Sequence, residues 1–141
     1  MIDLTAIDDA ILAKLRATNV FRAVKTLDAQ DLVTEDIAPM PSAHTMIGRA
    51  NYLPPEGRER RQVGTLGISV FVRTRNLRGD GSVRKNADGA YELINAVATA
   101  LLGYIPAPCG ELYLQQISPV RVDRLLAIYE VALLTDIEED Y

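Results

Sequence analysis

Hydrophobic side chains recur at helical spacing in two parts of the chain. In residues 3–17 they lie three or four positions apart, with acidic side chains in the early turns and basic ones near the end, as the helix dipole favours. Residues 91–102 carry a wider apolar stripe. Asp88 can cap this second helix, and Gly103 with Pro106 can stop it. The pattern predicts two amphipathic helices, and the second needs a sheet to cover.

Alternation of apolar and polar residues predicts strands. It is clearest in residues 65–74, where Leu66 and every second residue after it would face a core while Arg73 faces the other way. Residues 124–136 are apolar on both faces apart from Glu130, which predicts a central strand or a strand with one face in an interface. Shorter strands are predicted at 20–26, 43–47 and 111–117, with residues 118–123 separating the last two strands.

The remaining segments are polar. Residues 27–38 predict a loop or a short helical turn, and the stretches at about 49–62 and 77–89 predict two extended, exposed loops. Asp136, Glu138, Glu139 and Asp140 predict an acidic tail. Together the elements predict one α+β domain over residues 1–141. It should have one mixed or antiparallel sheet of about four to five strands, with two main helices packed on one face.

Length and composition fit a folded domain. The chain has 141 residues, of which 48% are hydrophobic and 24% charged, so it is large enough to bury a core. A net charge of −4 argues against a general attraction to nucleic acid or to anionic membranes. The single Cys109 cannot form an internal disulfide, and the first residues lack the pattern of a signal peptide. We therefore expect folding in a reducing cytoplasm and no transmembrane segment.

The residues that usually carry chemistry are scarce. One histidine and one cysteine cannot form the usual tetrahedral zinc site, and no nucleophile–base set or phosphate-binding glycine loop is present. His44 is expected to be a buried or half-buried structural residue, and Cys109 a small packing residue. We therefore expect no catalytic residue, no metal, no cofactor and no enzymatic activity.

Two groups of basic residues are the candidate interface. The first loop carries Arg58, Arg60 and Arg61, next to Glu56 and Glu59. A second, basic rim follows the strand at 65–74 and comprises Arg73, Arg75, Arg78, Arg84 and Lys85. A solvated mixed-charge loop is the alternative for the first group. We interpret both groups as contacts to partner proteins, because long loops in a small domain are more often retained for binding than for folding.

Three segments carry a resemblance to a known family: LGISVFVRTRN at 66–76, AYELINAVATALLGYIP at 90–106 and ELYLQQISPVRVDRLLAIYEVALLT at 111–135. In order and residue class the chain resembles phage tail terminator proteins, most closely those of Mu-like prophages. The resemblance implies a subunit without catalytic activity or cofactor, which forms a ring, usually hexameric, on the end of the tail tube. Such a ring stops tube polymerisation and offers a surface to the head.

The resemblance also implies where the protein acts and what it contacts. Its partners would be copies of itself, the tail tube and possibly sheath protein, and a neck or connector protein. DNA would only pass through the lumen, and no membrane is involved. The protein would lie at the head-proximal end of the tail in the virion, after assembly in the host cytoplasm. A head–tail connector or neck adaptor ring subunit is the alternative, and a small nucleic-acid-binding module that uses the arginines is a further one.

Overall fold

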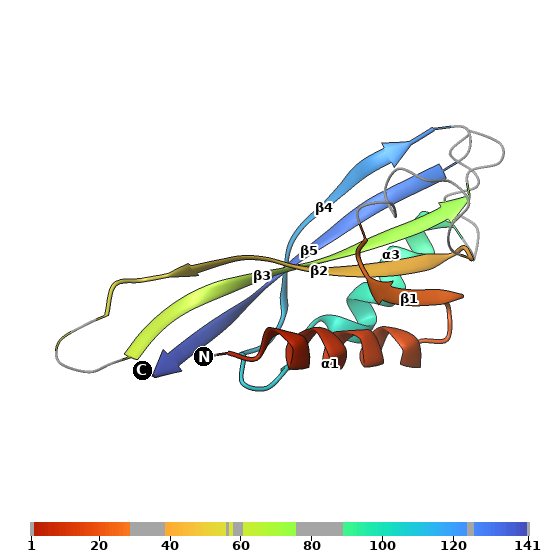
Figure 1. The fold of residues 1–141 in the computed structure, drawn as a ribbon. Helices are drawn as coiled ribbons and strands as arrows, with labels where there is room; N and C mark the ends of the chain where they lie inside the picture. The colour runs from red at the N-terminus through yellow and green to blue at the C-terminus, as the bar shows by residue number, and fades with distance from the viewer. Residues whose placement is uncertain are drawn as a thin grey trace.

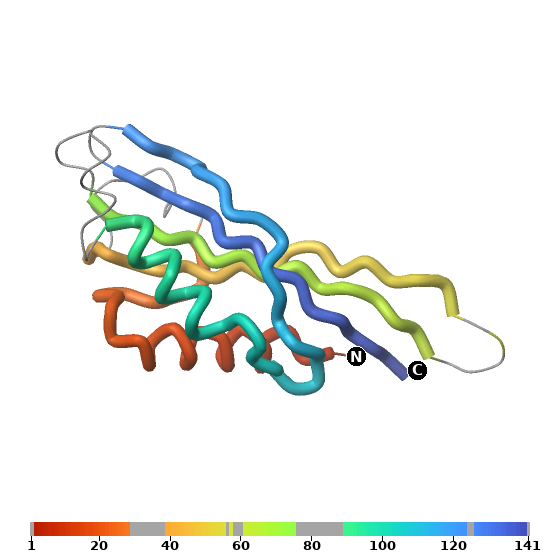
Figure 2. Tube along the Cα trace, turned by 180° about the vertical axis from the view of Figure 1, so that it is seen from behind, coloured from red at the N-terminus to blue at the C-terminus, as the bar shows by residue number. Residues whose placement is uncertain are grey.

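The computed structural model describes residues 2–28, 39–55, 57, 61–75, 89–123 and 126–140. They form one sheet of five strands with two helices on one of its faces (Figures 1 and 2). The elements are α1 (Leu4–Ala17), β1 (Ala23–Thr26), β2 (Ser42–Tyr52), β3 (Arg61–Arg75), α3 (Ala90–Leu101), β4 (Tyr113–Val122) and β5 (Leu126–Asp140). The strand order is β1-β2-β3-β5-β4, with β1 parallel to β2 and the other pairs antiparallel. The predicted α+β class with a mixed sheet is confirmed.

Both predicted helices are present. Asp3 caps α1 by accepting a hydrogen bond from the Ala6 amide at 3.0 Å, and the helix buries Ile7, Ile11, Leu12 and Leu15. The N-cap position of α3 is Gly89, and Asp88, which was predicted to cap this helix, lies outside the described residues. Its end follows the prediction: Gly103 adopts a φ of 80°, a left-handed conformation that glycine takes without steric cost.

A side chain of α1 ties the helix layer to the sheet. The Asp8 carboxylate accepts hydrogen bonds from the Thr26 hydroxyl of β1 at 2.6 Å and from the Thr45 hydroxyl of β2 at 2.5 Å. Both threonines come from strands that α1 covers. Asp8 therefore fixes where the helix lies along the sheet.

Replacing Asp8 with alanine is expected to lower the free energy of unfolding by about 1–3 kcal/mol, since two hydroxyls lose a charged acceptor. Urea unfolding followed by circular dichroism measures this. The exposed neighbour Asp9 provides the control, and Asp9→Ala should change stability by less than about 0.5 kcal/mol. Equal effects of the two variants would contradict the structural role of Asp8.

The main core lies between the sheet and the helices. Leu66, Ile68, Val70 and Val72 of β3 contribute to it as predicted, next to every second residue of β5 from Ala127 to Leu133. A second, smaller cluster lies on the helix-free face, where Phe71, Leu126 and Ile128 pack with Leu27 and Met40. The expectation of a single buried face for β3 is therefore wrong near its C-terminal end. At that end β3 is buried on both sides.

The long strands exceed their predicted bounds. Residues 49–52 and 61–62, predicted as part of an exposed loop, belong to β2 and β3, because main-chain pairing continues where neither face is deeply buried. Residues 118–122 belong to β4, and Pro119 is tolerated because an edge strand needs no N–H on its free side. The predicted acidic tail is the end of β5, paired with β3. By contrast, β1 covers only the last part of the strand predicted at 20–26.

Three strands project beyond the helices. We call this extension the ribbon; it comprises residues 48–52 of β2, 61–67 of β3 and 134–140 of β5. Figures 1 and 2 show it running past the start of α1, with the C-terminal end of β5 alongside. The other ends of β2, β3 and β5 lie beside the helices. The molecule is thus a two-layer body with a sheet extension at one end.

Candidate assembly surfaces

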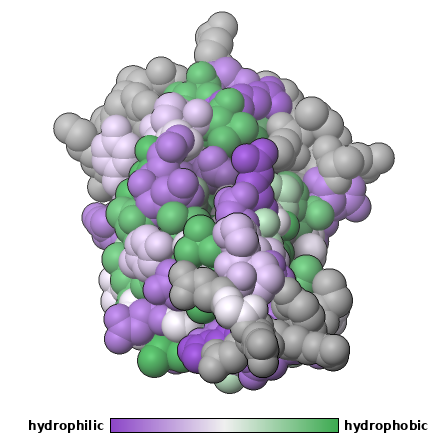
Figure 3. Space-filling view, turned by 90° about the vertical axis from the view of Figure 1, so that its left-hand side faces the viewer, coloured by the Kyte–Doolittle hydropathy of each residue, from purple (hydrophilic) through white to green (hydrophobic). Residues whose placement is uncertain are grey.

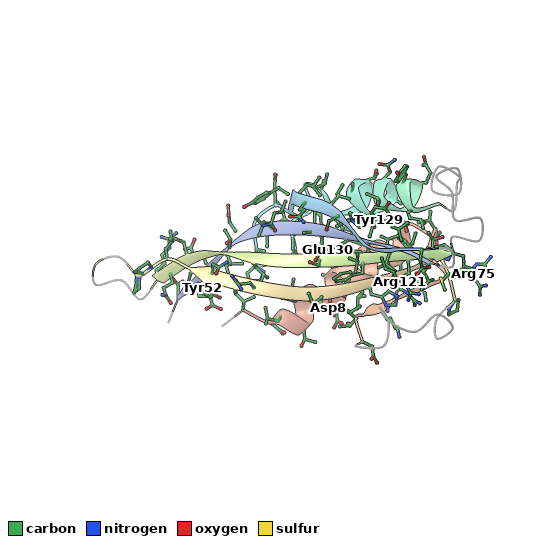
Figure 4. The ribbon with its side chains drawn as sticks, turned by 90° about the horizontal axis from the view of Figure 1, so that it is seen from above. Asp8, Tyr52, Arg75, Arg121, Tyr129 and Glu130 are labelled. Atoms are coloured by element: carbon green, nitrogen blue, oxygen red, sulfur yellow. The ribbon has the colours of Figure 1, made fainter. Side chains whose placement is uncertain are left out.

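The structure describes three of the eight predicted interface residues: Arg61, Arg73 and Arg75. Arg58, Arg60, Arg78, Arg84 and Lys85 lie outside the described residues. Arg61 and Arg75 are exposed and are the first and last residues of β3, so the 15-residue strand holds them at opposite ends of the molecule (Figure 1; Arg75 is labelled in Figure 4). Arg61 forms an ion pair with Glu138 of the neighbouring strand on the ribbon.

Arg73 is completely buried, with 0% of its surface exposed. The prediction that it belongs to an exposed basic rim is therefore wrong for the folded chain. Its strand position faces away from the main core, as expected, but its partners in the sheet are Ser42 and Ile128, which are buried as well. At this end the helix-free face is covered, so the side chain that points there is a core residue.

The ribbon carries a concentration of acidic side chains on β5: Asp136, Glu138, Glu139 and Asp140. Glu139 accepts a hydrogen bond from the Ile2 amide at 2.6 Å, which holds the start of the chain against the ribbon. Burial, then the hydrogen bond to Glu139 and the charge of Glu139, raise the pKa of Tyr52. Arg49 and Arg61 offset part of the charge, and the ribbon remains acidic over its described residues.

A groove runs where the ribbon meets the connection between α3 and β4. Its volume is about 650 Å³ and its lining is mostly apolar, including Tyr52, Leu53, Cys109 and Ile137. Cys109 is 6% exposed, which agrees with the expected packing role, and burial raises the pKa of its thiol. Figure 3 views the molecule from the ribbon end and shows hydrophobic and hydrophilic residues intermixed there.

Alkylation of Cys109 tests this packing. We expect iodoacetamide at pH 8 to react at least ~10-fold more slowly with the folded chain than with the chain in urea, because the thiolate is the reactive form and burial disfavours it. Mass spectrometry of time points measures both rates. Equal rates would show that Cys109 is accessible and that the groove is open at this point.

The helix-free face of the sheet is polar in its middle. Glu130, the exception in the sequence of β5, accepts a hydrogen bond from the Ser69 hydroxyl at 2.8 Å (Glu130 is labelled in Figure 4). The two residues line a shallow hollow of about 350 Å³ with Arg49, Gln115 and Gln116. Glu130 is therefore a paired surface residue of the sheet.

The remaining candidate chemistry is structural. His44 is buried as expected, with its Nε2 atom 2.9 Å from the Ser42 hydroxyl. Among the described residues, no three or more histidine, cysteine or acidic side chains come together as a possible metal site. No helix in the described parts of the chain is long and apolar enough to cross a membrane.

One surface was missed from the sequence. Five large apolar side chains of β4 are between 40% and 45% exposed: Tyr113, Leu114, Ile117, Val120 and Val122. The register of β4 against β5 shifts twice, after Leu114 and after Pro119, so these residues do not alternate regularly. The number of apolar residues between positions 113 and 122 was the available signal in the sequence. It was missed because residues 118–123 were predicted to separate two strands.

Comparison with known proteins identifies the family. A model of the family described as phage tail terminator protein matches residues 2–137. A solved chain from the virion of a native gene transfer agent particle has a similar fold, with a TM-score of 0.57 and 11% sequence identity. The match covers 94% of this chain and 94% of that chain. No curated protein matches the sequence. Because the family model spans nearly the whole chain, the protein belongs to the phage tail terminator family and is a virion structural protein of tail completion.

Proposed function

We propose that this protein assembles into a closed ring, expected to be a hexamer, on the head-proximal end of the tail tube. The ring stops tube polymerisation and presents the surface to which the head is joined. The observation that carries the proposal is the ribbon, a three-stranded extension that projects from the body of a chain in this family. A repeated head-to-tail interface needs two different surfaces per subunit, and a projecting element can reach the next copy.

The two ends of β3 support a division of contacts between tail and head. Arg61 on the ribbon and Arg75 at the far end of the strand are both exposed. In a ring whose axis runs along the strands, one end meets the tail tube, and the sheath where there is one, while the other meets the neck or connector protein. DNA passes through the lumen without being gripped, which agrees with the net charge of −4. We assign no catalytic step, because the family is one of structural phage proteins.

Deletion of the gene from a phage or prophage that encodes this chain tests the proposal. We expect electron micrographs of lysates to show tails of uncontrolled, greater length and heads without tails. Supplying the protein from a plasmid should restore tails of uniform length. Tails of normal length that lack heads would instead support the neck adaptor. Normal virions in the absence of the protein would overturn both assignments.

A further inference from the structure

The sheet has two open edges that lie on opposite sides of the molecule. Among the described strands, β4 pairs on one side only, with β5. β1 covers residues 42–45 of β2 and leaves the outer edge of residues 46–52 without a strand partner in the described chain. Both edges carry exposed apolar side chains, such as Ile117 on β4 and Met46 and Tyr52 on β2. Exposed apolar edges favour pairing with another chain.

We propose that β4 of one copy pairs with the outer half of β2 of the next copy, so that the sheet continues from subunit to subunit around the ring. The proposal rests on the proposed ring and names the surfaces that would hold it together. The partner is a second copy of this chain, because one chain carries both halves of the contact. A pairing between two unlike edges is heterologous and repeats around an axis.

The strand directions suit this junction. β2 is antiparallel to β3, β3 to β5, and β5 to β4, so β4 runs opposite to β2. Rotation about an axis along the strands keeps these directions in the neighbouring copy. The β4 of one copy therefore meets the next β2 in antiparallel orientation, whose hydrogen bonds are perpendicular to the strands.

The heights of the two edges also agree. Through the registers of the sheet, Met46 is opposite Ser69, which is opposite Ala132, which is opposite Gln116. Met46 and Gln116 therefore lie in one row across the sheet. A ring without axial rise brings these two residues to the same height in neighbouring copies.

The lengths of the two edges match as well. Pro119 has no N–H, and the register of β4 shifts directly after it, which limits regular pairing to residues 113–118. The open part of β2 covers residues 46–52, with a register shift between Ile47 and Ala50. The two open segments are thus of similar length. With Gln116 opposite Met46, antiparallel pairing sets residues 113–116 against residues 46–49. The side chains of Gln116 and Met46 lie on the same, helix-free face, because their row partners Ala132 and Ser69 do.

Cysteine cross-linking tests the junction. In a Cys109→Ala background, Gln116→Cys is combined with Met46→Cys, which tests the register argued above. A second pair combines Gln116→Cys with Asn51→Cys, five residues further along β2, and tests a shifted register. Within one chain these edges are three strand spacings apart, roughly 14 Å, too far for a disulfide, so any bond joins two copies. We expect oxidation to link most chains into a ladder on non-reducing gels, ending at the subunit number of the ring.

The controls separate the possible interfaces. Each single-cysteine variant should stay unlinked, since a like-with-like contact is needed to join two identical positions. A strong dimer from Gln116→Cys alone would overturn the heterologous pairing. Gln116→Cys with Glu92→Cys, which places the second thiol on α3, should give no ladder. If native mass spectra show rings but neither test pair forms cross-links, the edge pairing is overturned and the proposed ring still stands. Monomers alone would overturn the ring as well.

A lysine on the edge provides a second measurement. Ile117 is 43% exposed, so Ile117→Lys should leave the fold of the monomer unchanged while a charge directly next to the paired segment of β4 prevents assembly. Leu102, which is 42% exposed at the end of α3, is the matched control. We expect Ile117→Lys to sediment as a monomer with unchanged thermal unfolding and Leu102→Lys to remain a ring. Assembly of both variants would overturn the proposal.

Discussion

Replacing Arg73 with alanine is expected to lower the free energy of unfolding by about 2–5 kcal/mol, the range for truncating a large, fully buried side chain. Arg73 has 0% exposure and lies in β3 between buried residues of β2 and β5. Its removal leaves a cavity in the layer where Phe71 and Ile128 pack. The stem of an arginine contributes packing as well as charge, so much of this loss is apolar.

Arg75 is the matched control, because it is an arginine two residues further along the same strand and is exposed. Arg75→Ala should change the free energy of unfolding by less than about 0.5 kcal/mol. Guanidinium unfolding of both variants measures the difference. If the two variants have the same free energy of unfolding and only Arg73→Ala loses assembly, Arg73 belongs to an interface. Its burial would then contribute nothing to the stability of the folded chain.

Arg73 illustrates a limit of the sequence pattern. Alternation correctly placed Leu66, Ile68, Val70 and Val72 on the core face of β3, because burial against two helices selects apolar residues at every second position. The same alternation places Arg73 on the other face, and composition then suggests solvent. Whether a face is covered depends on segments distant in sequence, here including Leu27 and Met40. Alternation with a period of two therefore shows on which face of the sheet a residue lies, but it does not show whether that face is buried.

The ribbon shows the converse limit. The helices and the body of the sheet could be predicted because each buries one face, which leaves a periodic signal. In the β2 part of the ribbon, residues 48–52 are all exposed, so no period remains there. Main-chain hydrogen bonds to β3 and β5 hold these strands, and those bonds are independent of side-chain type. The β5 part of the ribbon still alternates, with Thr135 and Ile137 buried, but the acidic residues around them made this segment look like a tail. Pairing with β3 continues to Asp140.

Replacing Gly64 with alanine is expected to open the ribbon. A Cβ atom at Gly64 would lie 2.2 Å from the Asn51 carbonyl oxygen and 3.0 Å from the Tyr52 Cα, both main-chain atoms of β2 that have no free side-chain rotation. The two strands must separate at this point, and overpacking of this kind costs about 1–3 kcal/mol. Tyr52 ends the open edge of β2, so separation there also removes the surface proposed to pair with the next copy.

Gly67, three residues along the same strand, is the matched control. Gly67→Ala is the same substitution at a position where an added Cβ atom has more room. Its nearest contact to an added Cβ would be the Arg49 carbonyl oxygen at 3.5 Å, an ordinary van der Waals distance. Hydrogen exchange should therefore show faster exchange of the ribbon amides in Gly64→Ala and unchanged exchange in Gly67→Ala.

We expect sedimentation to show at least ~10-fold weaker assembly for Gly64→Ala alone, since about 1.4 kcal/mol lost at each junction corresponds to a factor of ten. Equal exchange and equal assembly of the two variants would mean that β2 does not approach β3 as closely as the structure has it. Loss of assembly with unchanged exchange would place Gly64 itself in a contact between copies.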